Sequence, residues 1–147
     1  MAITRNAPNV VYLGGPRVEN NTLAAKEVIT PGMLVDPDST GGVNRWKKAA
    51  TAGGPGTTFA TDQAMNNKGV DDVYNINDLV ETSTMGQGAT VWALIASGAN
   101  IAFGATLQNA GNGKLAAGAG SSQAFRALEA VNNTAGPSDA RIRVEVL

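Results

Sequence analysis

Cysteine and histidine are both absent from this 147-residue chain. Without cysteine there can be no disulfide bonds, thiolate zinc sites or cysteine nucleophiles. Without histidine the chain lacks the most common general base and metal ligand, and any serine–histidine–aspartate arrangement. We therefore expect a protein that is not an enzyme and that holds neither a metal nor a cofactor.

Charge is also scarce. Charged residues make up 16% of the chain and the formal net charge is −1, whereas an average soluble domain is about 25% charged. A nucleic-acid binder needs a cationic surface that displaces counterions from phosphates, so we expect no nucleic-acid partner. The sequence has neither a basic membrane-surface patch nor an apolar run of transmembrane length, so we expect no membrane partner. The first residues also lack the apolar core of a signal peptide, and we expect a protein made and used in solution.

Glycine is abundant, at 18 residues, and it separates short apolar or alternating runs together with proline and asparagine. Many short strands with closely spaced turns predict an all-β fold, a small β-barrel or β-sandwich with long Gly-rich loops. We expect residues 1–22 to form an extended N-terminal arm and residues 23–147 to form a single β domain. The apolar run 10–13 within the arm either folds onto its own domain as an edge strand or docks on a neighbouring subunit.

The most regular pattern is at the end of the chain, over residues 140–147. Apolar and charged residues alternate there, which is typical of a half-buried strand. We expect the apolar side chains to face the barrel interior and the charged ones to face outward, where an assembly could pair them. The apolar positions are Ile142, Val144 and Val146, and the charged positions are Arg141, Arg143 and Glu145.

Other segments predict further strands and turns. Residues 89–96 are rich in β-formers, and Asn112-Gly113 suits a hairpin turn whose return strand is 114–117. Pro31-Gly32 predicts a turn that pairs residues 28–29 with 33–35. The remaining predictions are a strand within 43–50, a strand beginning near Phe59 and a helical turn within 62–67.

Residues 121–131 give conflicting signals. Their helix propensity is high and a serine stands at a plausible N-cap, which favours a helix. The spacing of the neighbouring turns favours a strand instead. We adopt the strand, as does the resemblance described below.

Two motifs imitate ligand-binding loops. Residues 36–41 begin like a calcium loop, but Lys47 stands where a bidentate glutamate should complete the coordination. Residues 111–114 resemble part of a phosphate-binding loop, but Leu115 replaces the required serine or threonine. A polar turn and a hairpin are the better interpretations.

Two longer segments resemble a known family. One is 91–107 with 113–115, and the other is 127–130 followed by 140–147. Together they resemble the head decoration, or capsid cement, proteins of tailed bacteriophages, in outline over residues 23–147. The resemblance implies a β-barrel protein that binds the major capsid protein on the outer surface of the expanded head and stabilises it. It also implies a homotrimer that is made in the host cytoplasm and resides on the virion.

These expectations define a candidate subunit or capsid interface. The interface consists of the apolar part of the arm, exposed cations and a tryptophan flanked by cations. For the tryptophan, packing in the core is the simpler alternative. The candidate residues are Val10, Val11, Tyr12, Leu13, Arg17, Trp46, Arg141 and Arg143.

Two other functions stay open at this point. A carbohydrate- or ligand-binding module of a phage fibre or adhesin would use exposed Trp46 and Tyr74 as stacking surfaces. An enzyme working through carboxylates alone would need two of them to converge on a cleft. The spacing of the acidic candidates does not require that they converge; these are Asp62, Asp71, Asp72 and Glu81.

Overall fold

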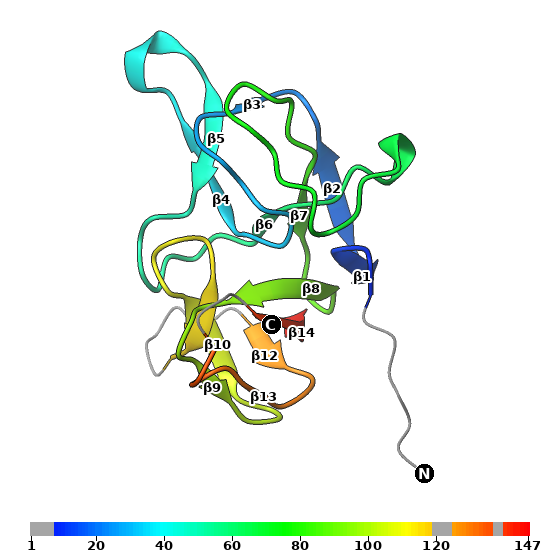
Figure 1. The fold of residues 1–147 in the computed structure, drawn as a ribbon, viewed down its shortest axis with the longest axis vertical. Helices are drawn as coiled ribbons and strands as arrows, with labels where there is room; N and C mark the ends of the chain where they lie inside the picture. The colour runs from blue at the N-terminus through cyan, green and yellow to red at the C-terminus, as the bar shows by residue number, and fades with distance from the viewer. Residues whose placement is uncertain (1–7, 119–124, 137–139) are drawn as a thin grey trace.

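Strands dominate the computed structural model (Figure 1), which describes residues 8–118, 125–136 and 140–147 and is all-β, as predicted. In chain order the strands are β1 Tyr12–Gly14, β2 Arg17–Asn20, β3 Ala24–Ala25, β4 Val35–Asp38, β5 Arg45–Lys48, β6 Thr58–Ala60, β7 Thr82–Met85, β8 Thr90–Ile95, β9 Asn100–Ile101, β10 Thr106–Asn109, β11 Leu115–Ala117, β12 Phe125–Ala127, β13 Val131–Asn132 and β14 Ala140–Val146. Two single turns of 3-10 helix, η1 (Thr40–Gly42) and η2 (Ala64–Asn66), lie in connections.

The lower half of the molecule in Figure 1 is a closed five-stranded barrel. Its strands follow the order β8-β11-β10-β12-β14, and β14 pairs again with β8 to close the ring. The final strand behaves as its alternation predicts, because Ile142 and Val144 have no exposed surface and Val146 is only 4% exposed. Burying a side chain of this kind contributes about 1.5–3 kcal/mol. The barrel expectation is therefore confirmed, and β14 is one of its walls.

The predicted hairpin and the disputed strand are both present. β10 pairs antiparallel with β11, and Gly113 has a φ of +78°, a conformation that glycine adopts without strain. Phe125–Ala127 pairs with both β10 and β14, so the strand interpretation is confirmed there. Residues 121–124 of that prediction lie outside the described residues.

The hairpin predicted around Pro31-Gly32 is wrong in its pairing. The turn itself forms, because Met33 N–H donates to Thr30 O and Gly32 has a φ of +96°. The flanking residues, however, find partners elsewhere: Ile29 bridges Tyr74, and Leu34 bridges Phe59. The predicted turn is therefore confirmed, but packing against distant segments determines which strands pair.

The upper half in Figure 1 consists of two three-stranded sheets, β2-β7-β6 and β3-β5-β4. It has its own apolar cluster, which includes Trp46 and Tyr74. Phe59 of β6 meets Phe125 of β12 edge-to-face, with ring centroids 5.5 Å apart, and both are fully buried. This contact joins the upper sheets to the barrel core.

Residues 8–22 lie on the molecule itself. β1 pairs with β8 and β2 pairs with β7, and Val11 is completely buried in the barrel cluster. This matches the alternative in which the apolar run folds onto its own domain. Residues 1–7 of the predicted arm lie outside the described residues.

Candidate functional site

A hollow of about 320 Å³ lies beside β2 and brings the N-terminal candidate residues together. Its walls come from β2, the segment around β1, η2 and the residue before β7. Three of the predicted interface residues line it, along with two of the predicted carboxylates. The lining residues are Val10, Tyr12, Arg17, Glu19, Asn21, Thr61, Asp62, Ala64, Met65 and Glu81.

Arg17 forms one rim of the hollow. Its guanidinium lies over the Tyr12 ring, 3.8 Å from the ring centroid, in a cation–π contact. It also forms an ion pair with Glu19, the next side chain on the same face of β2, with 2.7 Å between Nη2 and Oε1. The hydroxyl of Tyr12 donates to the carbonyl of Gly15. The cation is thus held at the surface between an aromatic ring and a carboxylate.

Three carboxylates line the hollow, those of Glu19, Asp62 and Glu81. Burial raises the pKa of the Glu81 carboxyl, and the nearby charges of Asp62 and Glu19 raise it further. Asp62 accepts a hydrogen bond from Val11 N–H at 2.8 Å, which ties the N-terminal segment to the loop before η2. The arrangement suits hydrogen-bond donors and cations, and it offers an apolar wall through Tyr12 and Val10.

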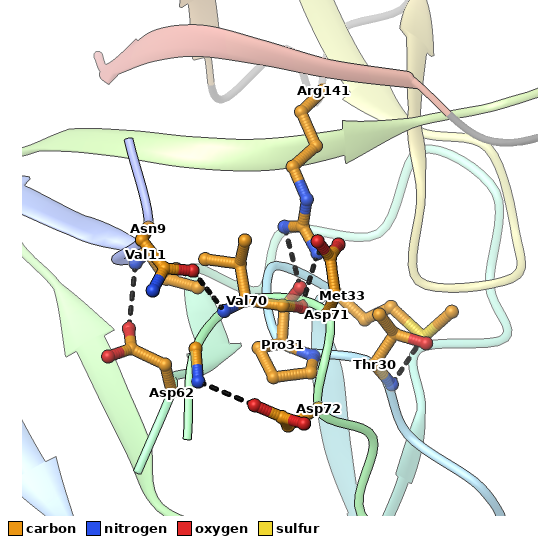
Figure 2. Close-up of polar contacts among 11 residues, drawn as sticks. Asn9, Val11, Thr30, Pro31, Met33, Asp62, Val70, Asp71, Asp72 and Arg141 are labelled. Carbon is orange, nitrogen blue, oxygen red and sulfur yellow. Dashed lines mark hydrogen bonds and ion pairs between the residues drawn. The ribbon is translucent and has the colours of Figure 1, made fainter. Parts of the chain in front are cut away.

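Arg141 lies at a second place, the junction between the barrel and the loop 69–72 (Figure 2). Its side chain is only 11% exposed. Nη1 donates to the carbonyl of Pro31 at 2.8 Å, and Nη2 donates to the carbonyl of Val70 at 2.6 Å. The expectation that Arg141 faces solvent or a partner is wrong. It joins three segments of its own chain, because its strand face is covered by a loop.

Asn9 strengthens the same junction from the other side. Its side-chain oxygen accepts a hydrogen bond from Val70 N–H at 3.3 Å, as Figure 2 shows. The exposed carboxylate of Asp71 is 3.9 Å from Arg141 Nη2, while Asp72 accepts a hydrogen bond from Gly69 N–H. The two adjacent aspartates therefore serve the loop in different ways and do not form a paired site.

Arg143 remains near the surface, at 25% side-chain exposure. Its guanidinium lies over the Trp92 ring at 5.6 Å from the centroid, and it faces Glu129 with 3.6 Å between Nη1 and Oε2. These contacts cover the outer face of the barrel between β8 and β14. The outward direction expected for Arg143 agrees with this placement.

Trp46 and Val11 do not belong to an exposed interface. Trp46 is 7% exposed and packs in the upper cluster, although cations flank it in the sequence. Tyr74 is 3% exposed, and its hydroxyl donates to the carbonyl of Thr61. The exposed aromatic surface required for carbohydrate stacking is therefore not formed by these two residues.

Two exposed apolar residues of this region were not among the candidates predicted from the sequence. Val18 is 71% exposed on β2, and Met65 is 97% exposed on η2. The alternation of Arg17, Val18 and Glu19 is a usable signal for a strand with one apolar position on its outer face. Nothing in the local sequence marks Met65 as exposed, because its exposure depends on how η2 projects from the fold.

No group of three or more acidic side chains within 8–118, 125–136 and 140–147 is arranged to hold a metal ion. Within the same ranges, no helix has the length and apolar character needed to cross a membrane.

The fold defines a class: a small all-β protein built on a closed five-stranded barrel with further sheets. The structure is similar to the N base of the head fiber protein gp8.5 of bacteriophage phi29, with a TM-score of 0.60 and 12% sequence identity. The alignment covers 90% of this chain and 95% of that chain. No family model matches the sequence, and no curated protein matches it.

Proposed function

We propose that this chain is a structural protein of a tailed-bacteriophage head, acting as a cement protein on the outer surface of the expanded capsid. In this proposal it is made in the host cytoplasm, binds the major capsid protein, forms homotrimers on the head and stabilises the shell. It performs no catalysis and needs no cofactor.

The observation that carries the proposal is the structural similarity to the phi29 head fiber base. It extends over 90% of this chain and 95% of that chain, so it concerns the whole fold and not one barrel. The resemblance of residues 91–107 and 140–147 to head decoration proteins points to the same part of a virion. The low charged fraction of 16% suits a protein that covers its surface by association.

The similarity also supports a second candidate, the base of a head fibre. A cement protein and a fibre base both bind the head, but only the cement protein has to stabilise the shell. The two differ in what binding does to the capsid, and one experiment can separate them.

The test mixes the purified chain with expanded capsids that lack it, and with unexpanded capsids as a control. Co-sedimentation measures binding, and release of packaged DNA on heating or osmotic shock measures stability. Binding with greater resistance supports the cement function, whereas binding without it supports a fibre base. If the chain does not sediment with either form of capsid, the proposed head-binding role is refuted.

A pair of matched variants tests the candidate surface. Val10 and Val43 are both partly exposed, at 41% and 50%, but Val10 lines the hollow beside β2 and Val43 follows η1. Val10→Glu is expected to weaken capsid binding, because it places a charge on the contact surface. Val43→Glu is expected to leave binding unchanged. Equal effects of the two variants would show that the capsid contacts another part of the surface.

A further inference from the structure

Strand β2 is the outer strand of its sheet. The sheet order is β2-β7-β6, so among the described residues β2 has a neighbour on one side only. All four of its residues, Arg17–Asn20, are exposed. An exposed strand edge is a template for another strand, because its backbone groups can continue the ladder of hydrogen bonds.

The register identifies which backbone groups face the free edge. β2 and β7 are antiparallel, with Val18 opposite Thr84 and Arg17 opposite Met85. On the other side of β7, Met85 N–H donates to Thr57 O, so the backbone groups of Met85 point toward β6. Because these directions alternate along a strand, the backbone groups of Thr84 point toward β2 and pair with Val18.

A second hydrogen bond gives the same result. Gly86 N–H donates to Pro16 O at 2.9 Å, so the bonded positions on β2 are the even-numbered ones. The N–H and C=O groups of Arg17 and Glu19 therefore point away from β7. Across the described part of the chain, the backbone groups of these two residues have no backbone partner.

We propose that β2 pairs antiparallel with β2 of a second copy of this chain across a two-fold axis. Arg17 then lies opposite Glu19 of the second copy, and Glu19 opposite its Arg17. Both residues present free backbone groups, so each of these pairs can exchange two backbone hydrogen bonds. The two three-stranded sheets become one continuous sheet.

Charge selects this register over its neighbours. A register uses the free backbone groups only when Arg17 or Glu19 of one copy lies opposite Arg17 or Glu19 of the other copy. Shifting the pairing by two residues sets arginine against arginine, or glutamate against glutamate, which is unfavourable. In the favoured register the two arginines and two glutamates alternate in sign around the axis.

Val18 adds an apolar contact at the centre. It is 71% exposed in the single chain, and it points to the face of the sheet opposite Arg17 and Glu19. In the proposed register it lies directly opposite Val18 of the second copy, as a non-hydrogen-bonded pair with closely spaced side chains. Pairing therefore covers the exposed apolar side chain of β2.

Charged residues on an edge strand commonly discourage pairing. Such charges prevent two strand edges from pairing when they have the same sign, because they then repel each other. Here a cation and an anion stand two residues apart on the same face and already attract each other at 2.7 Å. The edge is thus self-complementary, and the contact is small, so we expect weak association.

The test measures self-association of the purified chain by sedimentation equilibrium, without capsids, from about 10 μM to about 1 mM. The wild type is expected to double its mass with rising concentration. Arg17→Glu and Glu19→Arg are each expected to weaken this step about tenfold or more, because two attractive pairs become repulsive. Any trimer formed through another surface stays the same across the series.

Two complementations make the test specific. The double variant with Arg17→Glu and Glu19→Arg restores opposite charges and is expected to associate like the wild type. A mixture of the two single variants is expected to form mixed dimers, because one supplies two glutamates and the other two arginines. Arg126→Glu is the control for net charge, since Arg126 pairs with Glu145 on the barrel and not on β2.

Glu19→Pro, compared with Glu19→Gln, tests the backbone contribution, because both variants lack the carboxylate and only the proline variant lacks the N–H. It removes an N–H that faces the free edge and leaves the bonds to β7 intact, so circular dichroism should show an unchanged fold while association falls. The proposal is overturned if the wild type shows no concentration-dependent doubling. It is equally overturned if the charge variants associate like the wild type.

Discussion

Replacing Arg141 with methionine tests whether the junction in Figure 2 stabilises the fold. The guanidinium donates to the carbonyls of Pro31 and Val70, at 2.8 and 2.6 Å. Pro31 and Val70 are both buried. Methionine has a similar length but cannot donate, so both carbonyls lose a charged donor. Each such bond contributes about 1.5–3 kcal/mol, and with 11% exposure we expect a total loss of about 3 kcal/mol.

Urea denaturation followed by tryptophan fluorescence measures this loss, with a check that the m-value is unchanged. For a domain of this size, 3 kcal/mol corresponds to a fall in Tm of about 9 °C. Arg141→Lys is expected to lie between the wild type and Arg141→Met, because one ammonium cannot hold two carbonyls as a fork does.

Two matched controls separate the buried contact from charge alone. Arg126 is 51% exposed, and Arg126→Met is expected to cost less than about 1 kcal/mol. Asp71 is 95% exposed, and Asp71→Asn is expected to change stability little. If Arg141→Met were as stable as Arg126→Met, the reasoning about the buried carbonyls would be refuted.

Three further predictions follow from other contacts. Val144→Asp should prevent folding, seen as loss of the far-ultraviolet β signal, since it buries an unpaired charge at a position with no exposed surface; a folded variant would contradict the assignment of strand faces. Hydrogen bonds from Lys26, Thr40 and Lys47 hold the pKa of Asp38 well below its ordinary value of 3.8. The ionised Asp38 carboxylate therefore stabilises the fold above pH 3.8, and this contribution is lost as the pH falls below that value. Asp38→Asn should make the free energy of unfolding less dependent on pH in the acid range. An unchanged pH dependence would contradict this reasoning. Gly32→Ala should lower Tm, because the added carbon would lie 2.6 Å from Arg141 Nη1 at a φ of +96°; an unchanged Tm would show that the arginine moves aside freely.

Some elements could be predicted because their signals are local. The alternation over residues 140–147 has the period of a strand, and the barrel buries the three residues that alternation placed on one face. Asn112-Gly113 predicted a hairpin, and β10 and β11 form it. Turn residues and alternation act within a few residues, so they survive in any fold that the chain adopts.

Other features depended on segments far apart in the sequence. Residues 28–29 and 33–35 have suitable propensities for a hairpin, yet Ile29 bridges Tyr74 and Leu34 bridges Phe59. A turn brings neighbours close, but it does not outweigh the burial available from other partners.

The exposure of the candidate interface residues also depended on segments far apart in the sequence. By sequence alone, Arg141 and Arg143 occupy equivalent places on one face of one strand. The tertiary structure buries Arg141 under the loop 69–72 and leaves Arg143 over Trp92 near the surface. In the same way it buries Trp46 despite its flanking cations.

The sequence by itself determined an all-β chain without cysteine or histidine and the faces of its last strand, because composition and period-two alternation are local properties. Only the tertiary structure decided that β8 and β14 close a barrel, and that β2 is the outer strand of its sheet in the part of the chain that the structure describes. The pairing of distant strands depends on which surfaces the whole chain can bury together, and no short window of sequence contains that information.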